Sequence, residues 1–137
     1  MHINVKSGKN GQLKLKLLLD TNIIIDFLKQ DSAAFDLSSL FLQHECFTSV
    51  IVKLELLKYP DITPDEEHTV LEFLRLIPVM SLNESIENET IALSRSTKLK
   101  LPDAIIGATA IMYGAEVVTL DPHFLECQYK KLRVWKG

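Results

Sequence analysis

Short apolar runs alternate with helix-like segments along this chain, and this alternation restricts the possible folds more than any other feature. The strand-like runs cover 15–19, 46–50, 77–81 and 116–120, with a fifth candidate at 132–135. Apolar residues recur at helical spacing between them, over 23–28, 33–42, 51–59, 64–74, 84–98 and 104–113. Strands that alternate with helices form right-handed βαβ units. The sequence therefore predicts an α/β fold: a three-layer α/β/α domain with a mainly parallel central sheet of four to five strands.

The chain has the length of a single domain, with 137 residues. Residues 1–12 (MHINVKSGKNGQ) are polar and contain no apolar core of a signal peptide. We interpret them as a flexible N-terminal tail and assign 13–137 to the domain. No apolar run approaches the roughly 18 residues that a membrane span needs. We therefore predict a cytoplasmic protein with two reduced cysteines.

The charges nearly balance, with 15 Lys and Arg against 18 Asp and Glu and a net charge of −3. A protein that binds nucleic acid through bulk positive charge would be strongly basic, so this class is disfavoured. An enzyme that combines an acidic site with a local basic rim remains compatible with these totals.

Two of the predicted strands end in an aspartate. Asp20 follows Leu17 to Leu19 directly, and Asp121 follows the run 117–120. Ligands of parallel sheets gather at the carboxyl ends of the strands, so both acids are candidates for one site. The local alternatives are a helix cap for Asp20 and a turn residue before Pro122 for Asp121.

Two further acids lie in apolar surroundings. Glu55 interrupts the apolar stretch 50–57, where its side chain either faces solvent or points into a site. Asp103 opens the predicted helix 104–113, where it is either a cap stabilised by the helix dipole or a site residue. Hard divalent cations such as Mg²⁺ and Mn²⁺ prefer oxygen ligands. If the fold brings the four acids together, they form a metal site suited to phosphate chemistry.

These residues resemble the ordered motifs of the PIN-domain family, and most closely its VapC-type toxins from toxin–antitoxin pairs. The resemblance extends from about Lys16 to the C-terminus. Each motif alone is weak, but the four in this order and spacing form a specific pattern. They are Leu-Leu-Leu-Asp20-Thr21-Asn22, then Ser49 with Glu55-Leu56-Leu57, then Leu101-Pro102-Asp103-Ala104, then Val118-Thr119-Leu120-Asp121 with Phe124.

The resemblance implies a PIN-like fold and a Mg²⁺- or Mn²⁺-dependent endoribonuclease. Metal-activated water would hydrolyse RNA and leave a 5′-phosphate. The implied catalytic, metal-binding acids are Asp20, Glu55, Asp103 and Asp121; the supporting polar residues, which orient carboxylates or water, are Thr21, Asn22, Ser49 and Thr119. A toxin of this kind would have RNA as its substrate, a cognate antitoxin as its partner and a homodimer as its assembly.

The chain departs from the family pattern at two places. Many relatives carry Gly shortly after the helix glutamate, where this chain has Tyr59 and Pro60. A further acid often lies near the last Phe, where this chain has His123. His123 either binds phosphate or is an ordinary loop residue, and the second interpretation is favoured.

Two clusters of basic residues are candidates for contacts with RNA phosphates. The second cluster is more simply interpreted as solvated surface. The clusters are Arg95, Lys98 and Lys100, and Lys130, Lys131 and Arg133.

Two alternatives stay open at this point. A phosphoryl-transfer protein also places an aspartate at the end of a strand, although its phosphatase form requires an acid where this chain has Asn22. A catalytically silent PIN-like module would bind RNA or protein without cleavage. The presence of all four acids favours the nuclease over this silent module.

Overall fold

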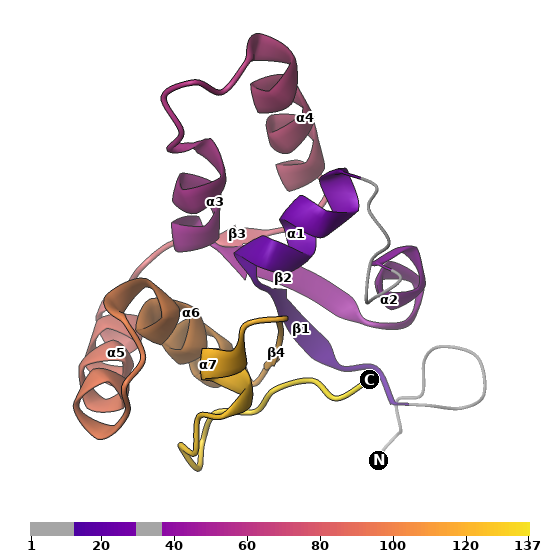
Figure 1. The fold of residues 1–137 in the computed structure, drawn as a ribbon. Helices are drawn as coiled ribbons and strands as arrows, with labels where there is room; N and C mark the ends of the chain where they lie inside the picture. Colours follow the sequence, from indigo (N-terminus) through magenta and orange to yellow (C-terminus); the bar gives the residue numbers. More distant parts are fainter. Residues whose placement is uncertain (1–12, 30–36) are drawn as a thin grey trace.

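A computed structural model of the chain describes residues 13–29 and 37–137 (Figure 1). The strands in these ranges are β1 (Lys16–Leu19), β2 (Glu45–Ser49), β3 (Val79–Met80) and β4 (Glu116–Val118). The helices are α1 (Thr21–Leu28), α2 (Leu37–Gln43), α3 (Val50–Leu57), α4 (Pro64–Leu74), α5 (Glu84–Ser96), α6 (Leu101–Met112) and α7 (Pro122–Leu125). The expected tail, 1–12, and the start of the second expected helix lie outside the described residues.

The four strands form a parallel sheet in the order β3-β2-β1-β4. The chain moves outward from β1 to β3 and then returns to place β4 on the other side of β1. Right-handed crossovers therefore put α5 and α6 on the opposite face from α1 and α3. Figure 1 shows this arrangement, with α5 and α6 on one side of the strands and α1, α3 and α4 on the other. The predicted mixed α/β fold with a parallel sheet is confirmed.

The central strands are apolar because both faces of the sheet are covered. Leu17, Leu18 and Leu19 of β1 have no exposed surface, and neither do Val117 and Val118 of β4. Continuous apolar runs of this kind are typical of buried parallel strands. These strands hold the ends that carry the acids in a rigid core. None of the helices in the described ranges is long and apolar enough to cross a membrane.

The structure corrects three local predictions. The expected strand 132–135 contributes only a single bridge, between Val117 and Val134. The strand expected at 77–81 is shortened to β3, two residues long. The segment after Asp121 is not a simple turn, because it forms the short helix α7. The two strand segments pair with strands that are distant in the sequence, whereas α7 is a single turn closed by local backbone hydrogen bonds.

Candidate metal centre

The carboxyl ends of β1 and β4 meet where the strand order reverses. The amide of Asp20 donates to the carbonyl oxygen of Val118 over 3.0 Å, which continues the pairing of the two strands. On the other side, the Thr48 hydroxyl donates to the Leu19 carbonyl oxygen over 2.7 Å. Such a reversal point is where open parallel sheets bind ligands. The topology therefore places Asp20 at the expected position for a site.

Asp20 is the most buried of the four acids, with 3% of its surface exposed. Its Oδ1 accepts a 2.8 Å hydrogen bond from the amide of Thr21, and its Oδ2 accepts a 2.6 Å bond from the Thr119 hydroxyl. Burial raises the pKa of Asp20, the two hydrogen bonds oppose that rise, and the charges of Glu55 and Asp121 add to it. Asp20 caps α1 and also belongs to the acidic cluster, so its two sequence interpretations are compatible.

Glu55 points toward Asp20 and is half-buried. The hydroxyl of Thr21 donates to Glu55 Oε1 over 2.6 Å, while the amide of the same residue holds Asp20. Val52 and Leu56 form the buried face of α3, so Glu55 lies on another side of the helix. Ser49 caps α3 by accepting a hydrogen bond from the Ile51 amide.

Asp121 is linked to Asp20 through Thr119. The Thr119 hydroxyl donates to Asp20 and accepts a 2.9 Å hydrogen bond from the Asp121 amide. Asn22 secures the same segment, because its Oδ1 accepts a 3.1 Å bond from the Leu120 amide. Asp121 itself is the N-cap of α7, and its Oδ1 accepts from the His123 amide over 2.9 Å.

Asp103 occupies the first turn of α6 and is not its cap. The N-cap is Lys100, which makes no side-chain capping bond, and the helix begins at Leu101. The pKa of Asp103 is raised to about 6, first by burial and then by the charges of Asp20, Asp121 and Glu55. Burial is the main cause of this rise, and repulsion by the other three acids adds to it.

The oxygen donors suit a hard divalent cation. Within 13–29 and 37–137, no three Asp, Glu, His or Cys side chains are already grouped tightly enough to enclose an ion. The carboxylates are instead held by hydroxyl and amide donors and repel one another. Mg²⁺ commonly uses only one or two carboxylates and keeps several waters. The oxygen donors of these residues therefore suit an open, partly hydrated cation site, and their role as metal ligands stays a prediction.

The two basic clusters have different surroundings. Arg95, Lys98 and Lys100 are exposed ahead of Asp103. In the second cluster, Lys131 pairs with Glu89 over 3.2 Å and the Arg133 guanidinium donates to the Gly114 carbonyl oxygen over 3.3 Å. The second cluster thus helps to attach the C-terminal segment to the domain. This contact agrees with its interpretation as ordinary surface.

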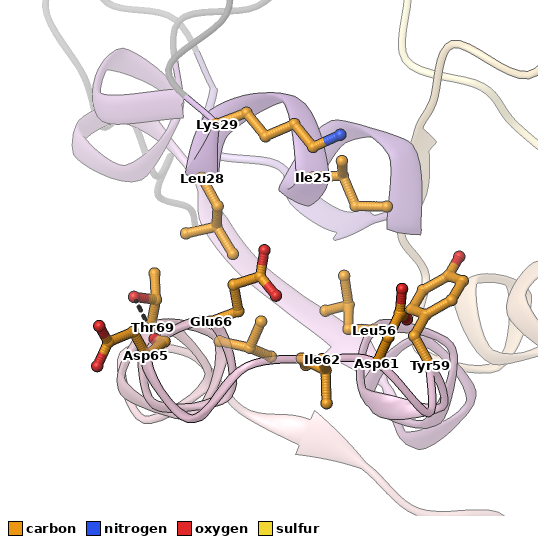
Figure 2. A pocket seen from close by; sticks show the side chains of 11 residues that line it. Ile25, Leu28, Lys29, Leu56, Tyr59, Asp61, Ile62, Asp65, Glu66 and Thr69 are labelled. Atoms are coloured by element: carbon orange, nitrogen blue, oxygen red, sulfur yellow. Dashed lines mark hydrogen bonds between the residues drawn. The ribbon is translucent and has the colours of Figure 1, made fainter.

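A groove of about 520 Å³ adjoins the helices that carry the site residues. Figure 2 shows α1 on one side and the ends of α3 and α4 on the other, with Glu66 pointing into the space between them. Its apolar lining residues are Ile25, Leu28, Leu56, Ile62 and Val70. Its charged lining comprises three acids and one base: Asp61, Asp65, Glu66 and Lys29.

The sequence interpretation missed the contact between His123 and Asp121. The imidazole Nδ1 lies 3.0 Å from Asp121 Oδ1. The available signal was the spacing Asp-Pro-His, which places the imidazole two residues after an acid at the start of a helix. Of the predicted site residues, Thr21, Asn22 and Thr119 bond to the strand ends or the acids. Ser49 acts as a helix cap.

Comparisons with known proteins agree with this architecture. A family model described as PIN domain matches residues 17–128. A search by sequence among curated proteins gives no match. The fold resembles a chain in the structure of VapBC2 from Rickettsia felis bound to promoter DNA, with a TM-score of 0.74, 19% identity and coverage of 88% of this chain and 98% of that one.

Two further solved structures show the same fold. A toxin–antitoxin complex from Klebsiella pneumoniae contains a chain with a TM-score of 0.63 and 27% identity, covering 86% of this chain and 99% of that one. The structure of VapBC-1 from nontypeable Haemophilus influenzae contains a chain with a TM-score of 0.70 and 22% identity, covering 88% of this chain and 97% of that one.

Proposed function

The chain belongs to the PIN-domain family, and from this premise we propose that it is a Mg²⁺- or Mn²⁺-dependent endoribonuclease. The observation that carries the proposal is the network at the ends of β1 and β4. There Thr21 joins Asp20 to Glu55, and Thr119 joins Asp20 to the backbone of Asp121. The charges of Asp20, Asp121 and Glu55 add to the rise in the pKa of Asp103. Asp20, Glu55, Asp103 and Asp121 are the proposed catalytic and metal-binding acids.

The chain's own residues would prepare this site for phosphodiester hydrolysis. Thr119 and Thr21 hold the two oxygens of Asp20, and Thr21 also orients Glu55. A divalent cation, when bound, supplies positive charge that offsets the negative charge of the phosphate and lowers the pKa of a bound water. The exposed Lys98 and Lys100 lie beside Asp103, where they would contact RNA phosphates.

Cleavage of a mixed RNA pool tests the enzymatic proposal. Wild type is compared with Asp20→Asn and Glu55→Gln in Mg²⁺, Mn²⁺ or EDTA. We expect metal-dependent cuts with 5′-phosphate ends from wild type alone. Glu72→Gln is the matched control, because Glu72 is an exposed acid on α4 that pairs with nearby Arg75. Equal cutting by wild type and Asp20→Asn would refute this site. Partner or RNA binding without cleavage would support the silent module.

The chain's partner is proposed to be an antitoxin that occupies the groove beside α1. One structure with this fold is a toxin–antitoxin complex, and another is a member of the VapBC family of toxin–antitoxin systems. The groove has an apolar floor and an excess of acidic groups at its rim, so it suits an amphipathic segment with basic residues. Two of the helices that line it, α1 and α3, also carry Thr21 and Glu55 of the acidic network. An occupant could therefore extend toward the metal site and block it.

Co-purification with a candidate antitoxin tests the groove. Ile62→Asp places a charge in the apolar lining and should abolish co-purification, because burying an unpaired charge is costly. Leu76→Asp is the control, since Leu76 is 72% exposed and lies outside the groove. If both variants bind as wild type does, the groove is not the contact surface. The homodimer implied by the family and the cytoplasmic location expected from the sequence stay predictions.

A further inference from the structure

His123 lies beside the acidic cluster but has no role in the function proposed above. Its side chain is 72% exposed, so packing alone does not explain its position. Its ring nitrogen Nδ1 lies 3.0 Å from Asp121 Oδ1, and its amide donates to the same oxygen over 2.9 Å. A carboxylate oxygen accepts hydrogen bonds, so this contact is a hydrogen bond when the imidazole carries its proton on Nδ1.

This contact matters because the local structure around Asp121 has little stability of its own. The helix that it caps, α7, is four residues long, and a single turn has little stability of its own. Asp121 is therefore oriented by a few specific hydrogen bonds. Its amide donates to the Thr119 hydroxyl, and its Oδ1 has two contacts from His123. The His123 contacts hold Oδ1. In the described ranges, Oδ2 receives no hydrogen bond and is the oxygen available to a ligand.

The imidazole also acts on Asp103. Among the charges that act on Asp103, His123 alone lowers its pKa, whereas Asp20, Asp121 and Glu55 raise it. The ring is therefore within electrostatic reach of Asp103 as well as in contact with Asp121. A group in this place influences how the carboxylates are arranged without being one of the acids.

We propose that His123 is a positioning residue that holds the Asp121 carboxylate through its Nδ1–H, so that Oδ2 faces a cation shared with Asp20. This inference rests on the proposed function, because it requires a cation at the acidic cluster. Groups that hydrogen-bond a metal-binding carboxylate orient it, and their loss typically lowers metal affinity or activity by about 10- to 100-fold.

Binding of Mn²⁺ to the full chain, measured by electron paramagnetic resonance at one fixed pH, tests this role without any RNA. The variants are His123→Ala, His123→Asn and His123→Gln. We expect His123→Ala to weaken binding by about 10-fold or more. The Asn amide nitrogen occupies the place of Nδ1 and should restore affinity to near the wild-type value. The Gln amide reaches the place of Nε2 and should behave as Ala does.

Matched controls separate the possible results. His68→Ala removes another exposed imidazole, on α4, and should leave Mn²⁺ binding unchanged. Circular dichroism and melting curves verify that every variant is folded. Wild-type affinity in His123→Ala would overturn the inference, and so would restoration by Gln but not by Asn, which would indicate a role for Nε2.

Asp20→Asn distinguishes failure of this inference from failure of the proposed function. Loss of Mn²⁺ binding in Asp20→Asn, with unchanged binding in His123→Ala, would overturn the role of His123 alone. Equal binding by wild type and Asp20→Asn, or no binding by wild type, would overturn both.

Discussion

Thr119 joins the two strand ends that carry aspartates, although its hydroxyl is a single small group. It donates to Asp20 Oδ2 over 2.6 Å and accepts from the Asp121 amide over 2.9 Å, and the residue is 3% exposed. Thr119→Val keeps the shape and removes both bonds. We expect the free energy of unfolding in urea to fall by about 2–3 kcal/mol, because one bond involves a carboxylate. Thr119→Ser retains the hydroxyl, so its free energy of unfolding should fall clearly less. An equal fall in both variants would refute the hydrogen-bond argument.

Asp103 should make the metal-free protein less stable as the pH rises. Its pKa is about 6 in the folded chain, against an ordinary value near 4. Between these values the folded state binds more protons than the unfolded state, so the free energy of unfolding falls with increasing pH. Asp103→Asn removes this contribution and should melt higher than wild type at pH 7, by a few degrees.

Melting curves from pH 4 to pH 7 in EDTA measure this effect. The difference in Tm between Asp103→Asn and wild type should grow as the pH rises from 4 to 6. Asp65→Asn, at an exposed position on α4, serves as the control, and its Tm should change with pH in the same way as that of wild type. Parallel curves for Asp103→Asn as well would contradict the repulsion among the four acids.

At the scale of elements, the helices begin where side chains satisfy their first amides. Thr63 and Glu66 form a reciprocal capping box at the start of α4, with bonds of 3.1 Å and 2.9 Å. Thr63→Ala should lower the free energy of unfolding by about 1 kcal/mol, whereas Thr63→Ser should change it little. Urea unfolding measures both. An unchanged free energy of unfolding in Thr63→Ala would show that the capping box contributes nothing to stability. Because α4 forms one wall of the groove, Thr63→Ala should also weaken partner binding.

The whole molecule concentrates repelling charge at one end of a rigid sheet. A cation that binds there should stabilise the folded chain, by roughly 1.4 kcal/mol at ten times its Kd. We therefore expect Mg²⁺ to raise the Tm of wild type by a few degrees and to leave that of Asp20→Asn nearly unchanged. The control Glu72→Gln should respond as wild type does. Equal responses of wild type and Asp20→Asn would exclude a shared site.

Local patterns in the sequence determined much of this fold. The apolar run before Asp20, the cap at Ser49 and the proline that opens α4 each predict an element from a few neighbouring residues. The interactions involved join residues within about one turn, so they can be read along the chain. The order of the strands and helices likewise predicted the parallel sheet and the sheet edge where the acids lie.

Only the tertiary structure decided how the acids are held. Thr119 meets Asp20 across 99 positions, and Thr21 meets Glu55 across 34. The groove beside α1, the contraction of β3 to two residues and the single bridge at Val134 also depend on packing between distant segments. The sequence supplies the polar groups, but burial and repulsion between carboxylates arise only when the strand ends meet in space.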